Sequence, residues 1–118
     1  MADYSPIFPS NPPYTSTASA AIVGGNVVEV SAAGTVQPAG AASVAVCGVA
    51  LFDAATNAQV TISRGGVQEL VASGTVTAGQ QIEAAAAGQV RTLASGRAIG
   101  VALTTATTGN KVQVIFGA

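Results

Sequence analysis

The chain has 118 residues, enough for one domain of ordinary size, and 49% of them are hydrophobic, mostly Ala and Val. Charged residues make up 8% and the formal net charge is −1, so the four scattered cations form no patch that would bind nucleic acid. A mean hydropathy of +0.53 excludes a solvated tail, and the small side chains predict a thin, sheet-like domain that could complete its core by packing against copies of itself.

The chain begins with the segment MADYSPIFPSNPPY, which holds four of the five prolines and three of the five aromatic residues. Proline-rich extended segments lose little entropy on docking, and aromatic side chains carry much of the binding energy at interfaces. We therefore predict an extended arm whose partner-binding residues are Tyr4, Ile7, Phe8, Pro9 and Tyr14. The alternative is an arm that folds back and covers one end of its own domain with Phe8.

A Ser/Thr/Ala stretch from Thr15 to Ala20 follows, and its composition is typical of a linker. We assign residues 1–21 to the arm and linker, and residues 22–118 to a single folded domain. Short runs rich in Val and Ile follow, several alternating apolar with polar residues, and glycine-containing turns separate them. The predicted strands are 27–30, 44–52, 59–63, 67–72, 81–85, 89–93, 98–104 and 111–116. The expected fold is all-β, a small barrel or sandwich.

The sequence also repeats itself. GGNVVEVSAAGTVQPAG (24–40) is similar to GGVQELVASGTVTAG (65–79), and GVALFDAATNAQVTI (48–62) is similar to GVALTTATTGNKVQVIF (100–116). In this alignment Glu29 matches Glu69, and QQIEAAAAGQVRTL (80–93) is a hairpin added to the second copy. The repeats predict internally duplicated β-units, with both glutamates facing outward from their strands.

Few residues of the chain can carry out chemistry. It has no His and one Cys, so the usual zinc ligands and a Ser-His-acid triad are missing, and we expect no metal site, no cofactor and no enzymatic activity. Cys47 lies in an apolar run and is expected to be a core residue. Lys111 begins the last predicted strand, which disfavours a lipoyl- or biotinyl-carrier. We also expect no targeting segment, and no membrane span, because glycines interrupt the uncharged residues 30–52.

The order and spacing of GVALFDA, VTISRGGVQELVASGTVTAG and the closing GVAL resemble the capsid decoration, or cement, proteins of tailed bacteriophages over residues 22–116. The resemblance implies a small β-barrel on the outer surface of the capsid in the virion. It further implies a trimer at quasi-three-fold positions, where it bridges major capsid subunits and stabilises the shell. The arm lies outside the resemblance, so its role depends on the physical argument alone.

A second hypothesis is a host- or carbohydrate-binding surface module. Such a module would present aromatic side chains on loops of the folded domain, whereas Phe52 and Phe116 lie in apolar runs and are expected in the core. The arm distinguishes the two hypotheses, because a decoration protein that has lost it should fold but hold capsids less tightly.

Overall fold

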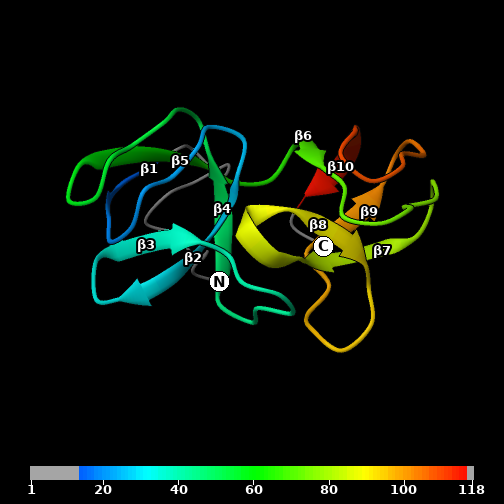
Figure 1. The fold of residues 1–118 in the computed structure, drawn as a ribbon, viewed down its shortest axis with the longest axis horizontal. Helices are drawn as coiled ribbons and strands as arrows, with labels where there is room; N and C mark the ends of the chain where they lie inside the picture. Colours follow the sequence, from blue (N-terminus) through cyan, green and yellow to red (C-terminus); the bar gives the residue numbers. More distant parts are fainter. Residues whose placement is uncertain (1–13, 117–118) are drawn as a thin grey trace, which may run out of the picture.

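A computed structural model describes residues 14–116, which form two β-rich lobes joined by residues 64–66 (Figure 1). Lobe 1, residues 14–63, contains β1 (Tyr14–Ala18), β2 (Val27–Ala32), β3 (Thr35–Pro38), β4 (Val46–Ala50) and β5 (Gln59–Ser63). These strands close into a barrel in the order β1-β3-β2-β4-β5. The first strand closes the barrel, because it pairs in parallel with β3 and antiparallel with β5.

Lobe 2, residues 67–116, contains β6 (Val67–Val71), β7 (Gln81–Ala84), β8 (Val90–Thr92), β9 (Gly100–Ala102) and β10 (Lys111–Phe116). They form a five-stranded sheet in the order β6-β10-β9-β7-β8. Within the described chain, the two outer strands β6 and β8 are joined by the parallel bridge between Ala72 and Val90 and by no longer ladder. Lobe 2 is therefore an incompletely closed barrel, and the all-β prediction is confirmed.

The two lobes are copies of one β-unit. Each strand of lobe 1 has the same neighbours as the strand five places later in lobe 2, except that β1 pairs with β3 whereas β6 and β8 meet only at the Ala72–Val90 bridge. The bridge between Ile22 and Ala54 recurs as the bridge between Val76 and Ala106. The hydrogen bond from the Ser19 N–H to the Val36 carbonyl likewise recurs between residues 73 and 90. Equivalent positions thus lie 54 residues apart through β3 (19 and 73, 36 and 90) and 52 apart from β4 onward (50 and 102, 54 and 106).

The duplication is thus confirmed, but the first half of the alignment made from the sequence is wrong. At an offset of 54, residues 24–40 correspond to 78–94, so the supposed extra hairpin at 80–93 is the counterpart of β2 and β3. Glu29 therefore corresponds to Glu83, and Glu69 corresponds to Thr15. Segments rich in Ala, Gly and Val match in several registers, and only strand pairing distinguishes them.

Two segments of the fold escaped the sequence prediction. Residues 14–18 form β1, so the stretch expected to be a linker belongs to the barrel and the fold begins before residue 22. The short strand β3 was missed because it has four residues and ends in Pro38. The eight predicted strands are all present, with ends that differ by up to two residues. No helix among the described residues is long and apolar enough to cross a membrane.

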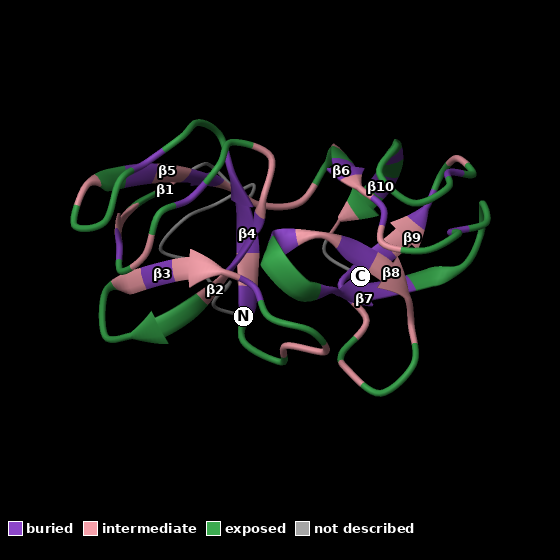
Figure 2. Cartoon of the chain, viewed as in Figure 1, coloured by how far each residue is buried: buried purple, intermediate pink, exposed green. Residues whose placement is uncertain are grey.

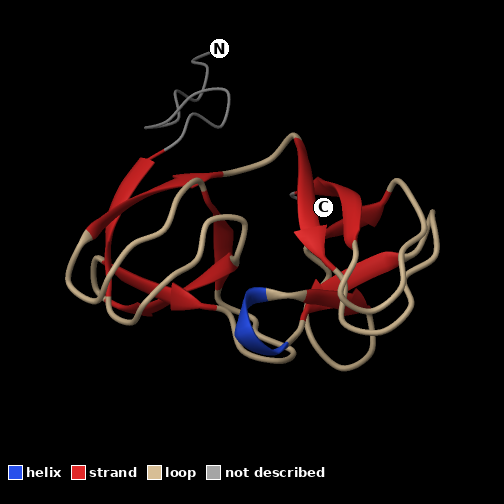
Figure 3. Ribbon diagram, turned by 45° about the horizontal axis from the view of Figure 1, so that its top comes forward, coloured by secondary structure: helices blue, strands red, loops and turns tan. Residues whose placement is uncertain are grey.

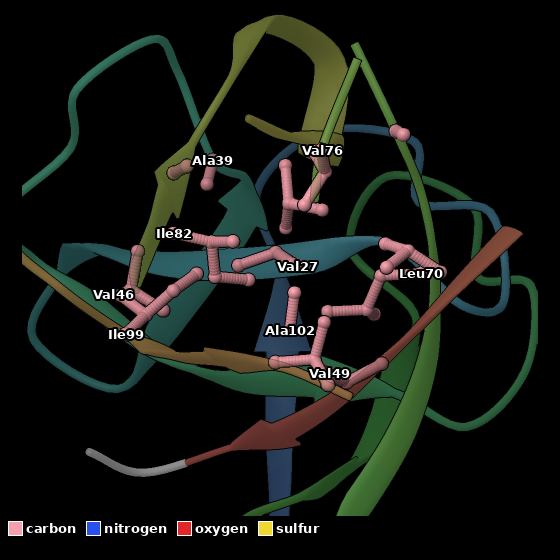
Figure 4. Packing of buried hydrophobic residues seen from close by; sticks show 14 of the residues in the cluster. Val27, Ala39, Val46, Val49, Leu70, Val76, Ile82, Ile99 and Ala102 are labelled. Atoms are coloured by element: carbon pink, nitrogen blue, oxygen red, sulfur yellow. The ribbon is translucent and has the colours of Figure 1, made fainter. Parts of the chain in front are cut away.

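The apolar core is divided unequally between the lobes. A smaller cluster that includes Val28, Val60 and Ile62 lies wholly within lobe 1. The larger cluster fills lobe 2, and four of its members come from lobe 1 instead: Val27, Ala39, Val46 and Val49. Figure 4 shows Val27 among Ile82, Leu70 and Ala102, and Figure 2 shows the buried residues of both lobes extending to their junction. Lobe 2 therefore completes its core with the outer face of lobe 1.

The junction also needs a glycine at one point. The β7–β8 connection makes a single 3-10 turn, Ala86–Gly88, which Figure 3 shows between the lobes. The Gly88 N–H donates to the Ala39 carbonyl at 3.0 Å. A Cβ on Gly88 would lie 2.7 Å from the Cβ of Asn26, and its φ of +74° is unfavourable for other residues. These contacts place the β7–β8 turn against lobe 1, and the turn does not pair with β6.

Candidate functional site

Four of the five predicted partner-binding residues, Tyr4, Ile7, Phe8 and Pro9, lie outside the described residues. The fifth, Tyr14, is the first residue of β1 and packs against the core cluster of lobe 1. The Arg64 guanidinium carbon lies 5.3 Å from the centre of its ring, in cation–π geometry. Burial, together with a hydrogen bond to the Cys47 thiol, raises the pKa of Tyr14 well above its usual value. This aromatic residue is therefore held on its own barrel.

A different surface carries exposed apolar side chains. The β1–β2 and β4–β5 loops of lobe 1 lie side by side, joined by the bridge between Ile22 and Ala54. The Gly24 N–H also donates to the Asp53 carboxylate at 2.7 Å. These loops expose Val23 (60%), Leu51 (51%) and Phe52 (48%), which we call the loop-end surface.

Phe52 is the one large aromatic side chain among the described residues that is classed as exposed, so the expectation that it belongs to the core is wrong. Phe116 fits that expectation better, because it packs partly buried against the larger cluster. Both lie in apolar runs, but the run containing Phe52 continues past the end of β4 into a loop. An apolar run identifies a strand and does not show where the strand leaves the core.

Lobe 2 has the same two loops without the same side chains. Its bridge lies between Val76 and Ala106, and the Ala78 N–H donates to the Thr105 hydroxyl where Gly24 donates to Asp53. At the offsets given above, Val23 corresponds to Thr77, Leu51 to Leu103 and Phe52 to Thr104. Two of the three apolar side chains are thus threonines in the other copy. The framework does not require the apolar residues, which favours a role in binding.

Further exposed apolar side chains lie elsewhere. Val67 and Ile115 face each other across β6 and β10, and Val30 and Val44 lie near the junction of the lobes. At the offsets given above, Val30 corresponds to Ala84 and Ile115 to Ser63, so one of these side chains has an apolar counterpart and one a polar counterpart. None of the four is aromatic, whereas the loop-end surface holds Phe52, and aromatic side chains carry much of the binding energy at interfaces. We therefore take the loop-end surface as the candidate site.

The buried ionic groups serve structure. Glu83 is the one fully buried charged side chain among residues 14–116, and it pairs with Arg91 at 2.6 Å. Its lobe 1 counterpart, Glu29, is less buried and accepts hydrogen bonds from Gln37 and the Gly40 N–H. Glu69 is exposed, opposite Gln113 on β10, as expected for an outward-facing residue.

The described residues offer little for catalysis. Cys47 is partly buried and its thiol hydrogen bonds to the Val28 carbonyl, and burial raises its pKa, which makes a reactive thiolate unfavourable. No group of three or more His, Cys, Asp or Glu in residues 14–116 could hold a metal ion. What the surface can do is bind another protein through apolar contacts.

The comparisons with known proteins agree with this. A family model described as phage cement protein matches residues 11–116, nearly the whole chain, so the chain belongs to the phage cement protein family. This family is structural and non-enzymatic, and the protein is a component of the virion associated with the phage head. The predicted resemblance to capsid cement proteins is confirmed.

A comparison with curated protein sequences gave no match. Among solved structures, the N base of the head fibre gp8.5 of bacteriophage phi29 is similar in fold, with a TM-score of 0.74. It is 14% identical in sequence, over 90% of this chain and 93% of that chain. Identity this low establishes the fold alone.

Proposed function

We propose that this cement protein binds the outer face of the phage head and stabilises it by bridging neighbouring major capsid subunits. The observation that carries the proposal is the loop-end surface, which exposes Val23, Leu51 and Phe52 in one copy of a duplicated framework whose other copy has two threonines there. Exposed apolar side chains on a well-ordered framework are typical of protein interfaces. The occupant of this surface is the major capsid protein.

The family match supports a location on the head, and the solved structure of similar fold is likewise described as the base of a head fibre. The net charge of −1 agrees with a position away from the packaged DNA. We further propose a trimer at the quasi-three-fold positions, because three copies of a small surface bind with higher avidity than one.

The arm is the second element of the proposal. Tyr4, Ile7, Phe8 and Pro9 would anchor each copy to the shell or to a sister subunit, with Tyr14 fixing the start of the arm on lobe 1. Because β1 begins at Tyr14, the arm can be removed at residues 2–13, whereas deletion to residue 20 would take away a strand of the barrel.

The test is co-sedimentation of the protein with expanded empty heads, comparing the wild type with Phe52→Thr, which gives lobe 1 the residue of lobe 2. We expect Phe52→Thr to weaken binding about 10-fold or more, as for an interface hot spot that contributes over about 1.4 kcal/mol. Leu103→Thr, on the equivalent loop of lobe 2, is the matched control and should bind like the wild type. Equal weakening by both variants, or by neither, would refute the loop-end surface as the docking site.

Deletion of residues 2–13 tests the arm separately, and the number of copies per head at saturation tests the trimer. A second candidate function is a host- or carbohydrate-binding module, favoured by one observation, the exposure of Phe52 on a loop. Failure of the wild-type chain to pellet with heads at micromolar concentration, together with binding to a glycan surface that Phe52→Thr abolishes, would favour this module.

A further inference from the structure

The loop between β8 and β9 is tied to a buried carboxylate. We call residues 93–97 the strap. The N–H groups of Ala94 and Gly96 donate to Oε1 of Glu83 at 3.0 and 2.6 Å, and the Arg91 Nε donates to Oε2 at 2.6 Å. Glu83 is fully excluded from solvent, and Arg91 is 36% exposed. Two backbone donors and a guanidinium thus hold one carboxylate in place, and hydrogen bonds to a charged group are stronger than neutral ones.

The strap packs closely against lobe 1. Gly96 lies so close to the loop at residues 40–45 that a Cβ on it would be 2.7 Å from the Ala42 Cα. Arg97 Nη1 donates to the Val44 carbonyl at 3.3 Å, and the Ala42 N–H donates to the Ala84 carbonyl at 2.9 Å, next to Glu83. In Figure 1 the two loops, teal and gold, extend toward each other at the lower edge of the molecule. The strap is therefore one of the ties between the lobes.

The facing loop has a similar support. Glu29, the counterpart of Glu83, accepts hydrogen bonds from the Gly40 N–H at 3.1 Å and from Ser43. Ala42 has a φ of +58°, which is unfavourable for Ala, so the surrounding contacts hold it there. Each of the two loops that meet between the lobes is thus fastened to an equivalent glutamate, one buried and one partly exposed.

We propose that Glu83 fastens the strap across the junction, and that protonation of its carboxylate releases the strap while both lobes stay folded. A neutral carboxyl accepts weakly from the two N–H groups and loses its ion pair. The other ties between the lobes do not involve Glu83: the Gly88 N–H bonds to Ala39, and the shared apolar cluster has no ionisable member.

Charged groups around the strap set the pH at which it would open. Arg91 on β8 faces the carboxylate, the strap itself contributes Arg97, which bonds to Val44, and the facing loop at residues 40–45 carries no ionisable residue. The hydrogen bond from the Ala94 N–H, then that from Gly96 and the Arg91 ion pair, outweigh burial and hold the pKa of Glu83 below its ordinary value. The strap is therefore closed at neutral pH and opens only in acid.

The test is amide NMR on the free protein, so its outcome does not depend on whether the protein docks on capsids as proposed. In the wild type, the Ala94 and Gly96 amide proton shifts should follow one acidic titration. In Glu83→Gln at neutral pH, hydrogen exchange at Ala94, Gly96 and Ala42 should accelerate at least 10-fold. Exchange at Gly88 and at the core position Ile82 should accelerate by no more than the loss of global stability requires, and by several-fold less than exchange at the strap.

Glu29→Gln is the matched control and should accelerate exchange at Gly40 while the strap stays protected. If Glu83→Gln fails to fold, the wild-type acid titration gives the same answer: Ala94, Gly96 and Ala42 should lose protection at a higher pH than Ile82. Uniform acceleration at all these amides, or none at the strap, would overturn the proposal, since Glu83 would then contribute only to global stability or to nothing at the junction.

Discussion

The two lobes share one β-unit but differ in how each is completed. Lobe 1 closes on itself, because β1 lies between β3 and β5, and it contains its own apolar cluster. Lobe 2 stays open between β6 and β8 and fills its core with Val27, Val46 and Val49 of lobe 1. A duplicated unit rich in Ala and Val buries little area alone, so the second copy gains stability by packing on the first. The core is thus completed against a copy within the same chain.

Equivalent positions in the two lobes show how the two copies of the β-unit diverged. Val27 is fully buried at the junction, whereas its counterpart Gln81 is exposed on the free side of lobe 2. The apolar side chain is present where another lobe covers it and is replaced by a polar one where nothing in the described chain does. The loop-end surface departs from this rule, since Phe52 is apolar and exposed. That departure is the reason for assigning it a partner outside the chain.

The largest effect is expected when each lobe is given the residue that the other lobe has at the equivalent position, 27 or 81. Val27→Gln should lower the free energy of unfolding by about 3 kcal/mol or more, because it removes a buried apolar side chain and places an amide among apolar neighbours. The reverse exchange, Gln81→Val, lies on an exposed position and should change stability by less than about 0.5 kcal/mol. Urea unfolding followed by circular dichroism measures both. If both variants lowered the free energy of unfolding by a similarly small amount, lobe 2 would not depend on lobe 1 to complete its core.

A second test uses equivalent glycines. Gly34 and Gly88 have φ values of +75° and +74°, but only Gly88 has neighbours where a Cβ would lie. Gly34→Ala should cost about 1 kcal/mol from backbone strain. Gly88→Ala should cost about 2–4 kcal/mol, because overpacking against Asn26 adds to the same strain. Thermal unfolding of the two variants gives the difference, and equal costs would show that the lobes separate easily at this point.

A smaller effect is expected from acid, and it distinguishes the two glutamates. The folded protein lowers the pKa of Glu83, so its contribution is present above the ordinary carboxyl pKa of about 4.3 and is lost as the pH falls through the lower folded value. Glu83→Gln should cost about 1–2 kcal/mol at pH 7 and make the acid-induced loss of stability shallower.

At Glu29, partial burial alone would raise the pKa, but hydrogen bonds from Gln37, Ser43 and the Gly40 N–H together lower it. Because this site is more accessible to solvent, Glu29→Gln should cost less than about 1 kcal/mol. Urea unfolding at pH 7 and at pH 3 checks both variants. A larger cost for Glu29→Gln than for Glu83→Gln would contradict the expectation that the buried glutamate of lobe 2 contributes more to stability than the partly exposed glutamate of lobe 1.

The candidate site was less accessible to sequence reasoning than the strands were. KVQV (111–114) alternates polar with apolar residues, and residues 112 and 114 are buried while 111 and 113 are exposed, as its pattern predicts. β1 gave a weak signal, since YTSTA has small and polar residues and only Ala18 is fully buried. Phe52 gave a misleading one. Comparing it with Thr104 would have flagged it, because the similarity of 48–62 to 100–116 was already visible in the sequence.

The sequence by itself determined the all-β class, the duplication, the lack of catalytic groups and the cement-protein resemblance, because these follow from composition, local alternation and motif order. Only the tertiary structure decided that Glu29 matches Glu83, that residues 14–18 close a barrel, and that Val27 is buried while Gln81 is not. The physical reason is that alternation defines two faces of a strand, and what covers each face depends on segments distant in the chain.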